Sequence, residues 1–432
     1  MTQVQQEKIR LAQNILDDLE IPIWMAFSDH KMGQDTMSMF LGGTKVPAML
    51  LLSPTQRRLI VHDLEADNIP QDEWKQDEVR VYLARNYTEV IAEALKELGF
   101  NNTLAVDYTT MGDALVDRIG AGTRDRIDDT VRSHFPEVVG DRDIRDVVTS
   151  SERILYALYD RKTPDELVKM GIAARRADDI LKQAFGELRP GMTEKEAFDL
   201  VKRITEETKA GFLEEKGLED EEYAWDAERC PTVLTGPSFV KGGHSGASDE
   251  ILQPGNTVYF DFGVKLYFPD GTHFCSDIQR MGYVLRDGET QASEEAQIVF
   301  NVLYRTISHG IEVMKPGAKG HEIDQMVRDF IREELREHGI KLPPKFKDLV
   351  YNHATGHPLG EESHNPGAKL GLYDKELGTQ HLTIQPHGVY TIEPRIPIVN
   401  GGSIEEDVVV NPDNDNYTLC PRQTGFYLIS GK

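Results

Sequence analysis

The chain has 432 residues, a length that suits two or three domains, and its hydrophobic content of 39% is typical of a globular protein rather than a disordered one. Its formal net charge of −25 disfavours binding to nucleic acids, because phosphate backbones attract basic patches. No segment resembles a signal peptide or a membrane span, and the 3 cysteines are too widely spaced for a disulfide framework, so we expect a cytoplasmic protein without nucleic-acid or membrane partners.

Residues 1–150 are expected to form one α/β domain, because strand-like and helix-like segments alternate along them. They contain neither the G-x-G-x-x-G pattern of dinucleotide-binding folds nor a P-loop. A polar stretch then precedes a predicted helix, and we place the domain boundary between residues 150 and 151. The predicted strands are Ile23–Phe27, Pro47–Leu52, Arg58–His62 and Leu104–Tyr108, and the predicted helix is Tyr87–Leu98.

Residues 151–432 begin with two predicted helices whose first turns carry capping boxes. Thr163 and Glu166 form the first box, and Thr193 and Glu196 form the second. Apolar residues recur at helical spacing in the first of these helices, so one of its faces is expected to be buried.

A repeated pattern in the same region brings an acid to the same position twice. One Gln-Pro turn opens an apolar strand that ends on Asp261, and a second Gln-Pro turn opens a strand that ends on Glu393. A further acid follows in each copy, Asp277 in the first and Glu405 or Glu406 in the second, since strand alternation alone allows either glutamate. A Pro-Gly turn and two helical patterns precede each copy. The pattern therefore indicates a duplicated helix–helix–strand–strand unit.

The acids of the repeat predict a metal site. Strand alternation places Asp261 and Tyr259 on one face of the strand, and Val258, Phe260 and Phe262 on the other. Four carboxylates on facing strands are too costly to bury without compensation, because an isolated ionised carboxylate in an apolar setting costs many kcal/mol. Bound metal ions supply that compensation.

Histidines complete the expected ligand set. His353, His357 and His364 lie in a glycine-flanked segment upstream of the strand that ends on Glu393, and His244 in Gly-Gly-His-Ser-Gly is an individually weaker candidate. Carboxylates with an imidazole suit Mn²⁺, Co²⁺, Fe²⁺ or Zn²⁺, and bridging carboxylates allow two ions. A glycosidase pair of acids leaves the histidines unexplained, and the sequence lacks H-E-x-x-H, G-x-S-x-G and C-x-x-C motifs.

With these motifs, the region from about residue 155 to the end resembles the pita-bread metallopeptidases, the family of methionine aminopeptidase, aminopeptidase P, prolidase and the metal-free creatinase. The resemblance implies an α+β fold with a duplicated ααββ catalytic domain over residues 151–432. Residues 1–150 resemble the smaller N-terminal α/β domain of the aminopeptidase P, prolidase and creatinase branch. The family's metal ligands occur in order as Asp261 in Asp-Phe-Gly, Asp277 in Ser-Asp-Ile, His357 in Gly-His-Pro-Leu-Gly, Glu393 in Thr-Ile-Glu-Pro and Glu405 in Ile-Glu-Glu-Asp.

The resemblance also implies a role for each ligand, and it selects Glu405 as the last of them. Asp261 would chelate one ion, and His357 and Glu393 would hold the other. Asp277 and Glu405 would bridge the two ions. Glu393 would in addition act as the general base toward the bridging water.

The same resemblance implies a hydrolase. His244 and His364 would contact the scissile peptide and stabilise the tetrahedral intermediate. The expected enzyme is an Xaa-Pro dipeptidase or Xaa-Pro aminopeptidase that uses a metal-bridged hydroxide. It would carry two divalent ions, with Mn²⁺ expected first and Co²⁺, Zn²⁺ and Fe²⁺ as alternatives, and would form a homodimer. Two other hypotheses stay open: hydrolysis of a different small C–N bonded molecule, and a catalytically silent peptide-binding homologue.

Three departures from the family pattern concern the substrate rather than the metal ions. Extra residues between Asp261 and Asp277 are expected to form a loop over the site. Arg395 stands where the family's Thr-Ile-Glu-Pro is usually followed by glycine, and Ser403 stands where the family often has arginine. No arginine of the sequence matches the carboxylate clamp that prolidases use.

Overall fold

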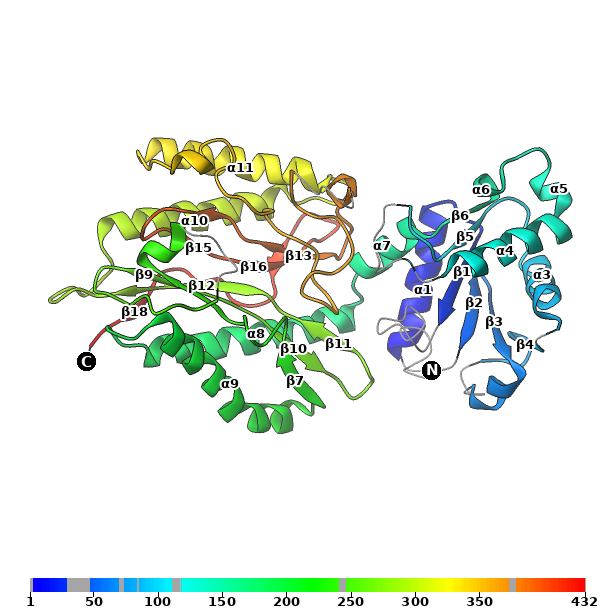
Figure 1. Ribbon diagram of the computed structural model, residues 1–432, viewed down its shortest axis with the longest axis horizontal. Coiled ribbons are helices and arrows are strands. Elements are labelled where there is room, and N and C mark those ends of the chain that lie inside the picture. The colour runs from blue at the N-terminus through cyan, green and yellow to red at the C-terminus, as the bar shows by residue number, and fades with distance from the viewer. Residues whose placement is uncertain are drawn as a thin grey trace. The chain divides into compact units, whose positions relative to one another are not determined.

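The computed structural model describes residues 3–28, 47–69, 74–83, 85–110, 117, 119–240, 246–372 and 378–431. The chain divides into two compact units, Met1–Tyr159 and Asp160–Lys432 (Figure 1). Within the described residues, no helix combines the length and the apolar character that crossing a membrane requires.

The first unit is built on a mixed sheet in the order β4-β3-β2-β1-β5-β6. Strands β1, β2 and β3 are antiparallel, while β4, β5 and β6 are each added in parallel. Apolar side chains of α3 and α4 pack on one face of the sheet, which confirms the predicted α/β domain. The strands are β1 (Ile23–Ser28), β2 (Ala48–Leu52), β3 (Arg57–His62), β4 (Val79–Tyr82), β5 (Leu104–Val106) and β6 (Val148–Ser150). The helices are α1 (Gln3–Asp18), α3 (Tyr87–Glu97), α4 (Ala121–His134), α5 (Pro136–Val139), α6 (Ile144–Val147) and α7 (Glu152–Asp160), with a 3-10 turn η1 (Asp63–Asn68).

The second unit begins with the two predicted helices, α8 (Pro164–Glu187) and α9 (Glu194–Lys216), and both capping boxes are formed. The hydroxyl of Thr163 accepts from the backbone N–H of Glu166, whose carboxylate accepts from the N–H of Thr163 in return. The pair Thr193 and Glu196 repeats this arrangement. Because each box satisfies N–H groups that a helix start leaves free, both helices begin where the sequence predicts.

The strands of the second unit lie between two layers of helices. In Figure 1, α8 and α9 cover one side of the strands, and α10 (Glu294–Val313) and α11 (Gly320–Glu337) cover the other. Each helix pair precedes its own strands, so the duplicated ααββ arrangement and the α+β pita-bread fold are confirmed. The strands of the first half are β7 (Asp220–Tyr223), β8 (Thr232–Thr235), β9 (Thr257–Phe262), β10 (Val264–Tyr267), β11 (His273–Cys275) and β12 (Ile278–Val284). Those of the second half are β13 (Val389–Ile392), β14 (Arg395–Ile396), β15 (Gly402–Ser403), β16 (Glu406–Val409), β17 (Tyr417–Thr418) and β18 (Tyr427–Ile429). Short 3-10 turns complete the unit: η2 (Gly236–Val240), η3 (Pro344–Phe346) and η4 (Thr379–His381).

The extra residues between Asp261 and Asp277 form the antiparallel hairpin β10–β11 rather than a free loop. Its turn is fixed to α8, because the ammonium of Lys169 donates to Asp270 and, at 3.0 Å, to the hydroxyl of Thr272. The expected loop is thus the tip of a hairpin, between Tyr267 and His273, and it is anchored on a helix.

Candidate metal centre

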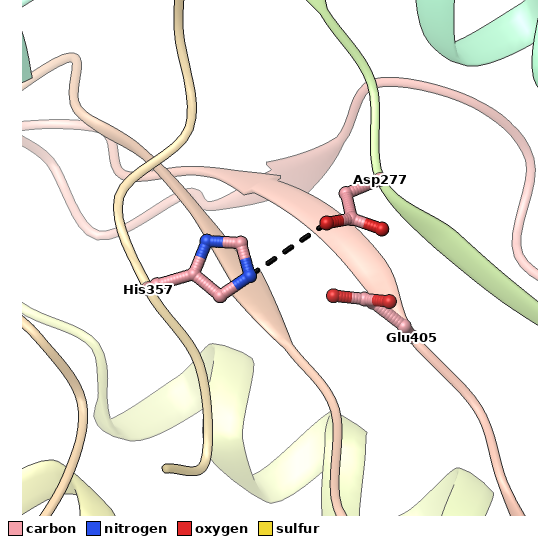
Figure 2. Close-up of side chains that lie close together, drawn as sticks. All are labelled: Asp277, His357 and Glu405. Atoms are coloured by element: carbon pink, nitrogen blue, oxygen red, sulfur yellow. Dashed lines mark ion pairs between the residues drawn. The ribbon is translucent and has the colours of Figure 1, made fainter. Parts of the chain in front are cut away.

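Three side chains from distant parts of the sequence meet in the second unit. Asp277, His357 and Glu405 each offer a ligand atom, and these atoms all lie within 4.8 Å of one another. Figure 2 shows the imidazole facing both carboxylates, with Nε2 of His357 3.7 Å from Oδ2 of Asp277. Their exposed fractions are 5% for Asp277, 7% for His357 and 1% for Glu405, so the group is almost closed to solvent.

Strand pairing explains why these residues meet. Asp277 immediately precedes β12 and Glu405 immediately precedes β16. Gln279 of β12 forms an isolated antiparallel bridge with Glu405, so the two strand starts lie side by side. His357 is held from β13, because its N–H donates to the hydroxyl of Thr391 at 3.1 Å and the N–H of Thr391 donates to its carbonyl at 2.9 Å.

The remaining two predicted ligands border the same group. Asp261 lies opposite Gln279 in the β9–β12 pair, close enough to Asp277 to hydrogen-bond with it when one of the two is protonated. Oε1 of Glu393 lies 3.6 Å from Nε2 of His357. Asp261 and Glu393 are half-buried, whereas the other three are buried, so these two carboxylates form the open side of the site. The structure thus brings all of the sequence-derived ligands into one cluster.

Burial and mutual repulsion shift the pKa values of the cluster. Burial raises the pKa of Glu393 to about 8, and the charge of Asp261 adds to the effect. Burial and then the neighbouring acids raise the pKa values of Asp277 and Glu405 well above the usual range of carboxyls. Burial, followed by the charge of His364, lowers the pKa of His357 well below the usual imidazole range. A cation placed among these groups would lower the pKa values of the carboxyls and would, like burial, favour the neutral form of His357.

The residues present fit divalent metal ions. Oε2 of Glu405 is buried and has no hydrogen-bond partner among the described residues. Within that same part of the chain, His357 is the group that ion-pairs with Asp277, and neither a lysine nor an arginine does so. Carboxylate oxygens with a single neutral imidazole are donors suited to Mn²⁺, Fe²⁺, Co²⁺ or Zn²⁺.

Strand alternation left Glu405 and Glu406 equivalent as ligands, and the structure separates them. The carboxylate of Glu406 lies 3.3 Å from Nη2 of the fully buried Arg280, away from the cluster that contains Glu405. Arg280 also pairs with Asp178 of α8 at 2.9 Å. Glu406 therefore belongs to a buried ion-pair network beneath the site.

Of the two histidines that are expected to contact the scissile peptide, the structure places one. The ring of His364 stands perpendicular to that of His357, with a centroid distance of 4.2 Å, and its side chain is exposed. His244 lies outside the residues that the structure describes.

The structure adds contacts of three residues, of which the sequence had singled out only His353, as one of the clustered histidines. Nδ1 of His353 lies 3.7 Å from Oε2 of Glu393, and Nε2 of Gln279 donates to the same oxygen at 3.4 Å. Oδ2 of Asp407 accepts from the N–H of Asp277 at 3.3 Å. Gln279 lies two positions after Asp277, and Asp407 lies two positions after Glu405. Because alternate residues of a strand project from the same face, this spacing in the sequence could have identified both residues.

Known proteins resemble this chain in sequence and in fold. The model of metallopeptidase family M24 matches residues 168–412. An uncharacterized peptidase of Staphylococcus aureus (strain MW2) is 29% identical over 260 residues, which are 60% of this chain and 61% of the relative. The match thus spans about three fifths of that relative's length.

Solved structures share the fold over nearly the whole chain. An Xaa-Pro dipeptidase from Bacillus anthracis has a TM-score of 0.59 at 21% identity and covers 99% of both chains. An X-Pro aminopeptidase from Thermotoga maritima MSB8 has a TM-score of 0.59 at 21% identity, over 96% of this chain and 99% of that one. At this level of identity the likeness shows the fold.

Proposed function

This chain belongs to metallopeptidase family M24, and from that premise we propose that it hydrolyses the peptide bond between an N-terminal residue and a following proline. The substrate is an Xaa-Pro dipeptide or the N-terminus of a longer Xaa-Pro peptide. The observation that carries the proposal is the buried group of Asp277, His357 and Glu405, whose ligand atoms lie within 4.8 Å of one another. The preference for proline is supported by the printed names of the Bacillus anthracis and Thermotoga maritima proteins, which share this fold.

Two divalent ions are part of the proposal, with Mn²⁺ as the first choice and Co²⁺, Zn²⁺ and Fe²⁺ as alternatives. Asp261 would contact one ion, and His357 and Glu393 the other. Asp277 and Glu405 would contact both, which agrees with their position as the most deeply buried carboxylates of the cluster. Bound ions of this kind lower the pKa of a coordinated water and polarise a peptide carbonyl.

Glu393 is the residue best placed to move a proton. Burial and the charge of Asp261 raise its pKa to about 8 without metal, and an ion held by Glu393 would lower that pKa and keep the carboxylate ionised, as a general base requires. Nε2 of Gln279 donates to Oε2 of Glu393 at 3.4 Å, and Nδ1 of His353, which donates to the carbonyl of Ala354, lies 3.7 Å from that same oxygen.

His364 contributes from the solvent side of the site. Its exposed ring abuts His357, where a substrate carbonyl entering over Asp261 and Glu393 would meet an N–H donor. His244 is proposed for the same task from the resemblance alone. A homodimer belongs to the proposal on that same basis, and a cytoplasmic location belongs to it because the 3 cysteines are widely spaced.

Hydrolysis of three peptides by the Mn²⁺-loaded protein tests the proposal. Alanyl-proline and alanyl-prolyl-alanine contain the proposed bond, and alanyl-alanine is the matched control without proline. We expect cleavage of at least one proline peptide and little of alanyl-alanine, with all cleavage lost in Asp277→Asn. Faster cleavage of alanyl-alanine would remove proline from the proposal. If a protein with bound Mn²⁺ cleaves none of the three, the substrate is another small C–N bonded molecule or the site is silent.

A further inference from the structure

The hairpin β10–β11 is hydrogen-bonded to the loop of residues 357–364. The backbone N–H of Cys275 in β11 donates to the carbonyl of Gly360 at 2.8 Å. The ammonium of Lys265 in β10 donates to Oε1 of Glu362 at 2.7 Å. Lys265 and Cys275 are direct partners in the antiparallel pair, so both hydrogen bonds leave the hairpin at the same level. The hairpin thus holds the middle of the loop at two points.

The ion pair between Lys265 and Glu362 is partly shielded from water. The side chain of Lys265 is 13% exposed and that of Glu362 is 31% exposed. Within the described part of the chain, each of the two is the other's one ionic partner. Fully exposed ion pairs hold a conformation only weakly, because water and salt screen them. This pair is better shielded and is therefore expected to hold the loop more firmly.

The loop is closed by the residue that follows His364. The N–H of Asn365 donates to the carbonyl of Pro358 at 3.0 Å, and its Oδ1 accepts from the N–H of Glu362 at 3.4 Å. Asn365 is 7% exposed, and a Cβ added to Gly360 would lie 2.7 Å from its Nδ2. Because the turn is so closely packed, a displacement of Glu362 would displace His364 as well.

The histidines at the two ends of the loop are supported differently. His357 is also held by β13, since its N–H and its carbonyl both form hydrogen bonds with Thr391. His364 is exposed and lies two positions after Glu362, with its ring perpendicular to that of His357. Loss of the ion pair should therefore move His364 while the metal ligand His357 stays in place.

The hairpin is itself fixed at its tip. The ammonium of Lys169 in α8 donates to Asp270 and, at 3.0 Å, to the hydroxyl of Thr272. The extra residues between Asp261 and Asp277 thus give the hairpin the length that lets it reach α8 while it holds the loop.

We propose that Lys265 is a positioning residue, which through Glu362 holds the loop so that His364 meets the carbonyl of the substrate. The inference rests on the function proposed above, in which His364 stabilises the tetrahedral intermediate. A hydrogen-bond donor stabilises a developing charge only when it is held in the correct place before the reaction. Loss of the ion pair should therefore slow hydrolysis without weakening the metal site.

A double-mutant cycle tests the proposal with the Mn²⁺-loaded protein and the faster of the two proline peptides. We expect Lys265→Met to lower kcat about 10-fold with KM nearly constant. In the His364→Gln background the same substitution should change kcat by less than about 2-fold, because the histidine to be positioned is gone. Equal losses of kcat in the two backgrounds would overturn the proposal.

Two further variants serve as controls. The exchange variant Lys265→Glu with Glu362→Lys restores the ion pair in reverse and should recover most of the lost kcat. Lys216→Met removes a lysine that is paired with Glu215 and is 41% exposed, so it should keep the wild-type kcat. In calorimetric titration, Lys265→Met should bind Mn²⁺ as tightly as the wild type does. A loss of Mn²⁺ affinity as large as the loss of kcat would assign the hairpin to the metal ligands and refute the proposal.

Hydrogen exchange separates this inference from the proposed function. If neither proline peptide is cleaved, the proposed function falls, and amide exchange of the Mn²⁺-loaded protein still decides whether Lys265 holds the loop. In Lys265→Met the amides of Glu362 and Asn365 should exchange about 10-fold faster than in the wild type, with those of β13 unchanged. Unchanged exchange in the loop refutes the proposal. Glu362→Ala serves for the same measurements if Lys265→Met fails to fold.

Discussion

Gln279 and Glu405 exchange backbone hydrogen bonds, from N of Gln279 to O of Glu405 at 3.4 Å and from N of Glu405 to O of Gln279 at 3.3 Å. This bridge joins the first half of the duplicated fold to the second. Because Asp277 immediately precedes β12 and Glu405 immediately precedes β16, the carboxylates of both halves converge on one site. Neither half contains the complete ligand set by itself.

Removing a charge at this junction should abolish metal binding without unfolding the protein. We expect Asp277→Asn and Glu405→Gln to lose Mn²⁺ binding in calorimetric titration and to lose peptide hydrolysis. Without metal, each variant should melt at or above the wild-type temperature, because a buried carboxylate in a cluster of like charges is destabilising. Asp287→Asn removes an exposed acid and serves as the control. Wild-type Mn²⁺ affinity in either variant would contradict the assignment of that residue.

Gln279 should affect catalysis more than stability. Its Nε2 donates to Oε2 of Glu393, but its own Oε1 is buried without a partner among the described residues. Gln279→Leu removes both the donor and this unsatisfied acceptor, so the melting temperature should change little. Loss of one oriented hydrogen bond to Glu393 should lower kcat about 5- to 10-fold with KM nearly constant. A fall in melting temperature that matches the loss of activity would indicate a purely structural residue.

The sequence predicted those parts of the molecule that depend on local signals. Capping boxes and apolar periodicity located α8 and α9, and the repeated Gln-Pro strands located Asp261 and Glu393. Contacts between distant segments carry no such signal, which is why the approach of His353 to Glu393 needed the structure. Register likewise decides that Arg395 faces Ser403, although both positions were already marked as departures. The pairing of β10 with β11 and the anchoring of their turn by Lys169 also needed the structure, because Lys169 lies far away in the sequence.

Substitution of Arg280 should lower the free energy of unfolding much more than substitution of an arginine in an exposed ion pair. It is fully buried between Asp178 and Glu406, and its Nη1 also donates to the carbonyl of Glu405 at 2.9 Å. Arg280→Met leaves both acids buried beside an apolar side chain, so we expect a loss of about 3–5 kcal/mol in the free energy of unfolding. The control is Arg336→Met, since Arg336 is paired with Glu333 on the surface of α11 and its side chain is 72% exposed. Chemical denaturation should show a far smaller change there, and equal losses would refute the role given to burial.

Asp160 should make the metal-free protein less stable as the pH rises. It is 1% exposed, and its Oδ2 accepts from the hydroxyl of Tyr390 at 3.0 Å and from the N–H of Ala368 at 3.3 Å. Burial raises its pKa from 3.8 to about 7, an effect that the charge of Lys162 only partly offsets. Between these two values the folded state keeps a proton that the unfolded state has released. Stability is therefore fully present below the lower value and declines as the pH approaches the upper one, by at most about 1.4 kcal/mol per pH unit.

Asp160→Asn isolates this contribution, because asparagine does not titrate and its carbonyl still accepts from Tyr390 and Ala368. Glu393, with a pKa of about 8, and Glu406, with one of about 7, titrate in both proteins. Their effect cancels when the variant is compared with the wild type. Chemical denaturation of both proteins without metal at pH 5 and pH 8 should show the wild type losing more stability between the two values than the variant does. Parallel losses in the two proteins would mean that Asp160 is ionised throughout, with Lys162 as its partner.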